Sequence, residues 1–186
     1  ENAFLGLVES VEEEFQKIDI LHNNVGIGLN DASPLKVREE AWDRIFSVNV
    51  KSALFACKAV IPVMRKKGFG VITNISSVAS IAGVRLITAY KASKAALNAY
   101  THSLAMSNAK YGIRANVIMP GLMNTPMAIE GYVATGRDRK ELIESRDASV
   151  PLGKKMGSAW DVANAALFLA SDEAKFITGV NLPVDG

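Results

Sequence analysis

The sequence predicts an α/β fold, a doubly wound parallel sheet with helices on both faces. Short apolar segments rich in branched residues alternate with longer segments of helical periodicity along the 186 residues, and strands separated by helices indicate a parallel sheet. The expected strands are nearly continuous apolar runs, which is typical of strands buried on both faces. No internal repeat, low-complexity tract or linker divides the chain, so we expect one domain, or most of one.

The first half of the chain predicts two helices and two strands. Apolar residues recur at helical spacing from Ala3 to Phe15, with four glutamates on the other side, which indicates an amphipathic helix. A long helix is expected over residues 37–66, kinked at Pro62. The first strand is expected at 18–21 and the second at 70–75.

The second half continues the alternation. A third helix is expected from about Leu86 to Tyr111, ended by Gly112 as its C-terminal cap. Ser158 and Asp161 have the spacing of a capping box at the start of another helix, which we expect to end at Ala170. The remaining segments are expected to be a strand at 114–119, a polar segment of irregular structure or short helices at 122–157, and a last strand at 179–184.

Composition excludes several classes of protein. The 21 basic and 19 acidic residues leave a net charge of +2 and are scattered along the chain, so we expect neither a nucleic-acid partner nor a membrane partner. No uninterrupted apolar run has the length of a membrane span. The single cysteine, Cys57, excludes an intrachain disulfide, and His22 and His102 have no companion ligands, so no metal site is expected. We expect a soluble, cytoplasmic protein.

Tyr90 and Lys94 are the first candidates for chemistry. Four residues apart near the start of the expected third helix, they share a face of it. A tyrosine with its ordinary pKa of about 10 exchanges protons poorly at neutral pH, whereas a nearby ammonium stabilises the phenolate and lowers that pKa. The pair is a weak signal by itself, because an isolated Tyr-x-x-x-Lys is more often two ordinary surface residues.

Small or polar residues follow three of the expected strands. Ser76 and Ser77 follow the second strand, and Ser77 lies thirteen residues before Tyr90. Asn24 and Gly26 follow the strand at 18–21, and Pro120 and Gly121 follow the strand at 114–119. The carboxyl ends of parallel strands border the ligand crevice of such sheets. Serines that bond only the backbone of a turn remain the alternative for Ser76 and Ser77.

Taken together, these motifs resemble those of the classical short-chain dehydrogenase/reductase family. The resemblance extends through the whole chain, and the interval between Ser77 and Tyr90 matches the family. It implies a Rossmann-like fold and an NAD(P)-dependent oxidoreductase that acts on a small ketone or alcohol. The first activity that the resemblance suggests is that of a 3-oxoacyl-(acyl carrier protein) reductase, although no residue singles it out. The matching segments are Asn-Asn-Val-Gly at 23–26, Val-Asn-Val at 48–50, Ile-Ser-Ser at 75–77, Tyr-Lys-Ala-Ser-Lys at 90–94, Pro-Gly at 120–121, and Thr-Gly to Val-Asp-Gly over 178–186.

The resemblance also implies roles for individual residues. Tyr90 would be the catalytic acid/base, and Ser77 would hydrogen-bond the substrate oxygen. Lys94 would hold the nicotinamide ribose and lower the pKa of Tyr90, and Asn49 would anchor a water molecule in the proton relay to Lys94. The other residues that would contact NAD or NADP are Asn24, Val25 and Gly26 near the adenosine ribose, with Val25 in place of the usual alanine, and Pro120, Gly121, Met123 and Thr125 near the nicotinamide carboxamide.

The family's opening strand and glycine-rich phosphate turn have no counterpart in this sequence. Gly26-Ile27-Gly28 lacks both the third glycine and the helix that should follow it. We therefore expect residues 1–186 to be one N-terminally truncated domain of about four strands, in which the choice between NAD and NADP is open. A non-catalytic binding module or an inactive fragment remains the alternative to an enzyme. The resemblance further implies a substrate lid at 122–157 and a homodimer or homotetramer.

Overall fold

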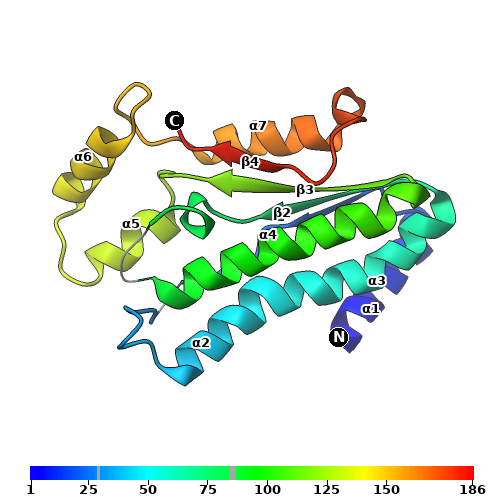
Figure 1. The fold of residues 1–186 in the computed structure, drawn as a ribbon, viewed down its shortest axis with the longest axis horizontal. Coiled ribbons are helices and arrows are strands. Elements are labelled where there is room, and N and C mark those ends of the chain that lie inside the picture. Colours follow the sequence, from blue (N-terminus) through cyan, green and yellow to red (C-terminus); the bar gives the residue numbers. More distant parts are fainter. Residues whose placement is uncertain (29, 84–86) are drawn as a thin grey trace.

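Four parallel strands form the sheet of this protein, as the sequence predicts. The computed structural model describes residues 1–28, 30–83 and 87–186 (Figure 1). The strands lie in the order β1-β2-β3-β4, and every residue of β2 is buried. Their bounds are Ile20–Asn23 for β1, Gly70–Ile75 for β2, Ile113–Pro120 for β3 and Asn181–Val184 for β4.

Helices cover both faces of this sheet (Figure 1). On one face lie α3 (Ser52–Lys67) and α4 (Thr88–Asn108), with α1 (Asn2–Phe15) packed against α3. On the other face lies α7 (Ala159–Ala170). Each face has its own apolar core: Val60, Met64, Ile72, Leu104 and Ile113 are among the buried residues of the first, and Ile75, Ile118, Leu169 and Ala174 form the second. The predicted doubly wound α/β architecture is confirmed.

Two strand boundaries differ from the sequence prediction. β1 begins and ends two residues later than expected, because polar side chains at its end pair across the sheet: His22 Nδ1 lies 2.6 Å from Thr73 Oγ1, and Asn23 Nδ2 donates to Asn74 Oδ1 at 2.8 Å. β4 begins at Asn181 rather than at residue 179, because Gly179 has a left-handed φ of 74°. The pattern of apolar residues in the sequence reveals neither the polar pairing at the end of β1 nor the left-handed φ of Gly179.

The expected helix over 37–66 is a continuous helical segment with a wide turn in its interior. It begins with α2 (Glu39–Phe46), passes through a π-helical turn (Ser47–Lys51) and continues as α3, which runs through Pro62 without interruption. A π turn accommodates one additional residue. Residues spaced four apart, such as Ile45, Asn49 and Ala53, therefore stay on the same buried face.

The apolar character of this segment differs from the sequence expectation. Over its 29 residues, Glu39–Lys67 includes an 18-residue window of mean hydropathy 1.4, long and apolar enough by composition alone to cross a membrane. In the structure 39% of that window is buried. Core helices of soluble proteins meet the same criterion, so the finding is weak evidence for a membrane span.

The remaining helices follow the prediction closely. The expected start of the third helix at Leu86 lies outside the described residues; from Thr88 onward α4 and a 3-10 turn (Ala109–Tyr111) lead to Gly112, whose φ of 72° provides the predicted cap. α7 begins with the predicted capping box of Ser158 and Asp161. Segment 122–157 contains α5 (Pro126–Val133) and α6 (Arg139–Ser149), which share a small apolar core of Ile129, Leu142, Val150 and Met156.

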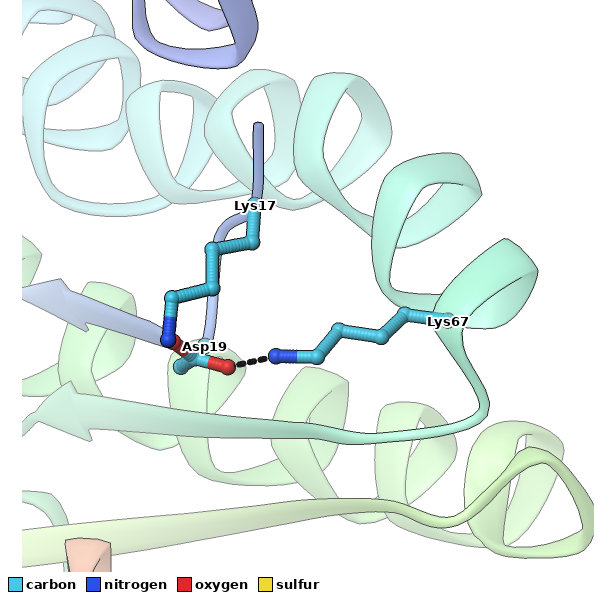
Figure 2. Close-up of polar contacts among 3 residues, drawn as sticks. All are labelled: Lys17, Asp19 and Lys67. Carbon is cyan, nitrogen blue, oxygen red and sulfur yellow. Dashed lines mark hydrogen bonds and ion pairs between the residues drawn. The ribbon is translucent and has the colours of Figure 1, made fainter. Parts of the chain in front are cut away.

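A cluster of charged residues lies at the amino ends of the strands. Asp19, just before β1, accepts from the ammonium groups of Lys17, at 3.0 Å, and of Lys67 at the end of α3 (Figure 2). The carbonyl of Asp19 accepts from the N–H of Val71 at 2.9 Å. All three side chains are at least a third exposed, so these ion pairs stabilise the fold little. They lie at the opposite end of the strands from the candidate site.

Candidate active site

The segments that follow β1, β2 and β3 meet at the carboxyl edge of the sheet, because the three strands are parallel and adjacent. Ser76 continues the pairing of β2, since its N–H donates to the carbonyl of Ile118 at 2.8 Å. Its hydroxyl donates to the carbonyl of Lys94 at 3.0 Å, so the end of β2 is bonded directly to α4. This contact brings the predicted serine motif to the helix that carries Tyr90 and Lys94.

The Ser77 hydroxyl lies near enough to Tyr90 to affect the pKa of the phenol. The Ser77 hydroxyl also accepts from the N–H of Ala79 at 3.1 Å and caps the 3-10 turn Val78–Ser80. Burial raises the pKa of Tyr90, and the Ser77 hydroxyl opposes that effect because it bonds the phenolate. Tyr90 therefore holds its proton at neutral pH.

Lys94 lies one helical turn after Tyr90 and is 4% exposed. Its Nζ donates to the carbonyl of Ile75 at 2.7 Å and lies 5.7 Å from the centroid of the Tyr90 ring. Burial lowers the pKa of Lys94 to about 8, because the charged form is poorly solvated there. The expected net lowering of the Tyr90 pKa is wrong for this structure, because burial of the phenol raises that pKa.

The loop after β1 packs closely against this pair. A Cβ added to Gly26 would lie 3.1 Å from Lys94 Nζ and 3.5 Å from Asn49 Oδ1, and one added to Gly28 would lie 3.3 Å from the Tyr90 ring. The two glycines therefore allow the loop backbone to approach the predicted acid/base pair. Of the other predicted residues of this loop, Val25 is 67% exposed and Asn24 is also exposed.

Asn49 connects the same loop to α4. It lies in the π turn, is 1% exposed, and bonds both backbone groups of Ile27: Oδ1 accepts from the N–H at 2.8 Å, and Nδ2 donates to the carbonyl at 2.9 Å. Nδ2 also donates to Ser93 Oγ at 2.9 Å, and Ser93 in turn donates to the carbonyl of Tyr90 at 2.7 Å. Asn49 therefore positions the loop on the Tyr90 helix through its own hydrogen bonds.

The predicted residues after β3 form the entry to the helical segment 122–157. The N–H of Gly121 donates to the carbonyl of Val184 at 2.9 Å, and a Cβ at Gly121 would lie 2.6 Å from that of Asp185, so only glycine fits there. Pro120 is the last residue of β3, and Thr125 precedes α5. Met123 is buried and forms a parallel bridge with Gly157, which closes this segment at its base.

Sequence reasoning missed Asp31 and a buried polar network. The Asp31 carboxylate accepts from the N–H groups of Ala89 and Tyr90, which are 58 and 59 residues away. Asn74, which accepts from Asn23, donates to Thr101 on α4 at 2.8 Å. No local pattern could have revealed the contact of Asp31, whereas the polar pair Thr73-Asn74 inside an apolar strand was a usable signal for the network.

Comparisons with known proteins agree with this geometry. A family model described as enoyl-(acyl carrier protein) reductase matches residues 1–186. The chain is 38% identical over 181 residues to the 2-(R)-hydroxypropyl-CoM dehydrogenase of Xanthobacter autotrophicus, with coverage of 96% of this chain and 70% of that protein. It is 37% identical over 180 residues to the 3-oxoacyl-[acyl-carrier-protein] reductase of Thermotoga maritima, with coverage of 97% and 70%.

Two crystal structures superpose on the whole chain. One is assigned to the short-chain dehydrogenases/reductases, from Burkholderia xenovorans, with a TM-score of 0.94 and 36% identity. The other is an NAD⁺-bound xylitol dehydrogenase, with a TM-score of 0.91 and 33% identity. The match covers 100% of this chain in both, 70% of the first structure and 74% of the second.

Proposed function

The chain belongs to the short-chain dehydrogenase/reductase family of NAD(P)-dependent oxidoreductases, and we propose that Tyr90 is the acid/base for interconversion of a small ketone and its secondary alcohol. The observation that carries the proposal is the buried ammonium of Lys94, 5.7 Å from the centroid of the Tyr90 ring, together with the Ser77 hydroxyl, which lowers the pKa of Tyr90. A phenol that lies near a hydroxyl and a buried ammonium is suited to exchange a proton with a substrate oxygen.

The residues at the sheet edge fit a nicotinamide dinucleotide. Gly26 and Gly121 keep the backbone open where a Cβ would meet Lys94 or Asp185, and the buried Lys94 ammonium can donate to ribose hydroxyls. NAD or NADP would supply the hydride chemistry that no side chain provides. By analogy with the family, the residues that would hold it are Asn24, Val25 and Gly26 at the adenosine ribose, Tyr90 and Lys94 at the nicotinamide ribose, and Pro120, Gly121, Met123 and Thr125 at the carboxamide.

In this proposal the chain's own residues bind the substrate oxygen and move one proton. Ser77 donates a hydrogen bond to the carbonyl oxygen, and Tyr90 gives its proton to that oxygen in reduction or takes it back in oxidation. Because burial raises the pKa of Tyr90, the phenol is protonated at neutral pH, which suits the reductive direction. Lys94, with a pKa of about 8, is mostly charged at pH 7 and stabilises the phenolate that is left behind.

Asn49 supports this proton transfer from the π turn. Its hydrogen bonds to Ile27 and Ser93 hold the β1 loop and the Tyr90 helix in one arrangement. We also assign to it the family's role of anchoring a relay water that leads to Lys94.

Segment 122–157 would be the substrate lid of a single domain. Met127 on α5 is 56% exposed and Tyr132 is 41% exposed, so this segment offers apolar surface to a small ketone or alcohol. The proposal includes a homodimer or homotetramer in the cytoplasm, without nucleic-acid or membrane partners.

The direct test is turnover by the full-length gene product that contains these residues. We expect it to bind NADH or NADPH and to oxidise it in the presence of small ketones such as cyclopentanone, followed by the loss of absorbance of the reduced nicotinamide. Dinucleotide binding without turnover of ketones, secondary alcohols or 3-oxoacyl thioesters would indicate the non-catalytic alternative and would contradict the proposal.

A further inference from the structure

Asp31, in the loop after β1, caps the helix that carries Tyr90. Its Oδ2 accepts from the N–H of Tyr90 at 2.7 Å, and its Oδ1 accepts from the N–H of Ala89 at 3.1 Å and from its own neighbour Ala32 at 2.7 Å. The first N–H groups of a helix have no partner within the helix. One distant carboxylate therefore satisfies two of these groups in α4.

Ile87, the described residue just before α4, does not provide this cap. It occupies the N-cap position and has no side-chain acceptor to offer. The N–H and the hydroxyl of Thr88 both donate to the carbonyl of Ala32, at 3.2 and 2.8 Å. Each of the first three residues of α4 is thus bonded to the segment Asp31–Ala32, which sets the position of the Tyr90 backbone.

The same loop also contacts the Tyr90 side chain. Gly28 lies against the ring, and Ile27 is bonded on both backbone groups by Asn49. Two charged groups face Tyr90 among the described residues: Lys94 from its own helix, and Asp31 at the positive end of the helix dipole. The ammonium of a further charged residue of α4, Lys91, is bonded elsewhere, since it donates to the carbonyl of Ala82.

We propose that Asp31 is a positioning residue for proton transfer by Tyr90. It fixes the first turn of α4, and with it the phenol, relative to Ser77, and its charge influences how readily the phenol loses its proton. The proposal rests on the function proposed above for Tyr90. A negative charge at the amino end of α4 disfavours the phenolate, so removal of this charge should let Tyr90 titrate at lower pH.

The variant D31N of the full-length gene product tests this role. The amide keeps the size and one acceptor oxygen of the carboxylate but loses its charge. Titration of Tyr90, followed by the ultraviolet absorbance of tyrosinate as the difference from a Tyr90→Phe background, should move down by about half a pH unit. With cyclopentanone as the probe, kcat should fall about tenfold or more while KM stays within about twofold, because the substitution affects the alignment and the proton affinity of Tyr90 but removes no group that binds the substrate. The midpoint of the pH profile of kcat should move down with the titration.

The matched control is D161N, which removes a helix-capping carboxylate from the other face of the sheet. Asp161 accepts from the N–H of Ser158 at 2.6 Å at the start of α7. This variant should lose stability but keep the native Tyr90 titration and the native pH profile. If D31N proves unstable, D31S keeps a neutral capping hydroxyl, and the same downward shift is expected of it.

The two proposals fail in different ways. A native Tyr90 titration and a native kcat in D31N or D31S would overturn the role of Asp31, and so would an equal shift in D161N. A native protein that turns over no substrate would overturn the proposed function, whereas a shifted Tyr90 titration in D31N would still support the coupling of Asp31 to Tyr90.

Discussion

Gly26→Ala should separate the function of the β1 loop from the stability of the fold. The new Cβ would lie 3.1 Å from Lys94 Nζ and 3.5 Å from Asn49 Oδ1. Neither neighbour is free to move away: Lys94 is bonded to the carbonyl of Ile75 at 2.7 Å, and Asn49 bonds both backbone groups of Ile27. The loop or the ammonium must therefore shift by a few tenths of an ångström.

This shift should cost the stability of the fold less than it costs dinucleotide binding. Gly26 does not have a positive φ, so alanine brings no backbone strain there. The cost of overpacking is about 1–3 kcal/mol, and the lower entropy of the unfolded chain with alanine offsets about 0.4–1 kcal/mol of it. We expect a net loss of about 1 kcal/mol, which lowers the Tm of a domain this size by about 2–4 °C.

Dinucleotide affinity should fall much more than stability does, because the displaced ammonium is the group proposed to hold the ribose. We expect Kd for NADH or NADPH, measured by fluorescence titration of the full-length gene product, to rise about tenfold, equivalent to about 1.4 kcal/mol. Gly6→Ala is the matched control: a Cβ at Gly6, inside α1, would meet nothing within 4 Å. It should raise stability by up to about 1 kcal/mol and leave affinity unchanged. Native affinity in Gly26→Ala would refute the reasoning.

Two further predictions concern the buried polar groups of the site. Asn49→Ala removes three hydrogen bonds and leaves both backbone groups of Ile27 without their partner. Urea unfolding should therefore show a free energy of unfolding that is lower by about 2–4 kcal/mol. A decrease below about 0.5 kcal/mol would contradict the proposed role of these hydrogen bonds in holding the loop. Lys94 has a folded-state pKa of about 8, below its ordinary value of 10.5, so above pH 8 the unfolded state binds more protons than the folded state does. The stability of the native protein relative to Lys94→Met should therefore rise by about 1 kcal/mol between pH 8 and pH 9, and a flat or falling difference in urea unfolding would be inconsistent with a desolvated ammonium.

Much of the fold could be predicted because its signals are local. β2 begins and ends where the apolar run between Gly70 and Ile75 does, and the capping box of Ser158 and Asp161 marks the start of α7. The spacing of Ser76-Ser77, Tyr90 and Lys94 predicted that the serine motif lies at the Tyr90 helix, because a parallel sheet brings the end of β2 to the start of the next helix. These features depend on residues close together in sequence or on a rule of topology.

The features that could not be predicted depend on distant contacts or on depth of burial. Asp31 caps α4 across almost sixty intervening positions, and the π turn around Asn49 shows in the sequence only as a spacing of four residues between Ile45, Asn49 and Ala53, the last two of which are small or polar. The direction of the Tyr90 pKa was wrong because spacing to Lys94 is visible in the sequence, whereas burial of the phenol is not. The direction of the pKa shifts in the site could therefore be inferred only from the structure.

Tyr90→Phe tests the central claim most directly, because it removes one oxygen atom and keeps the ring that packs on Gly28. In the full-length gene product we expect kcat for ketone reduction to fall about 10²–10⁴-fold, with the Kd for NADH or NADPH within about twofold of the native value. A Tyr90→Phe protein that keeps the native kcat would show that Tyr90 is not the acid/base.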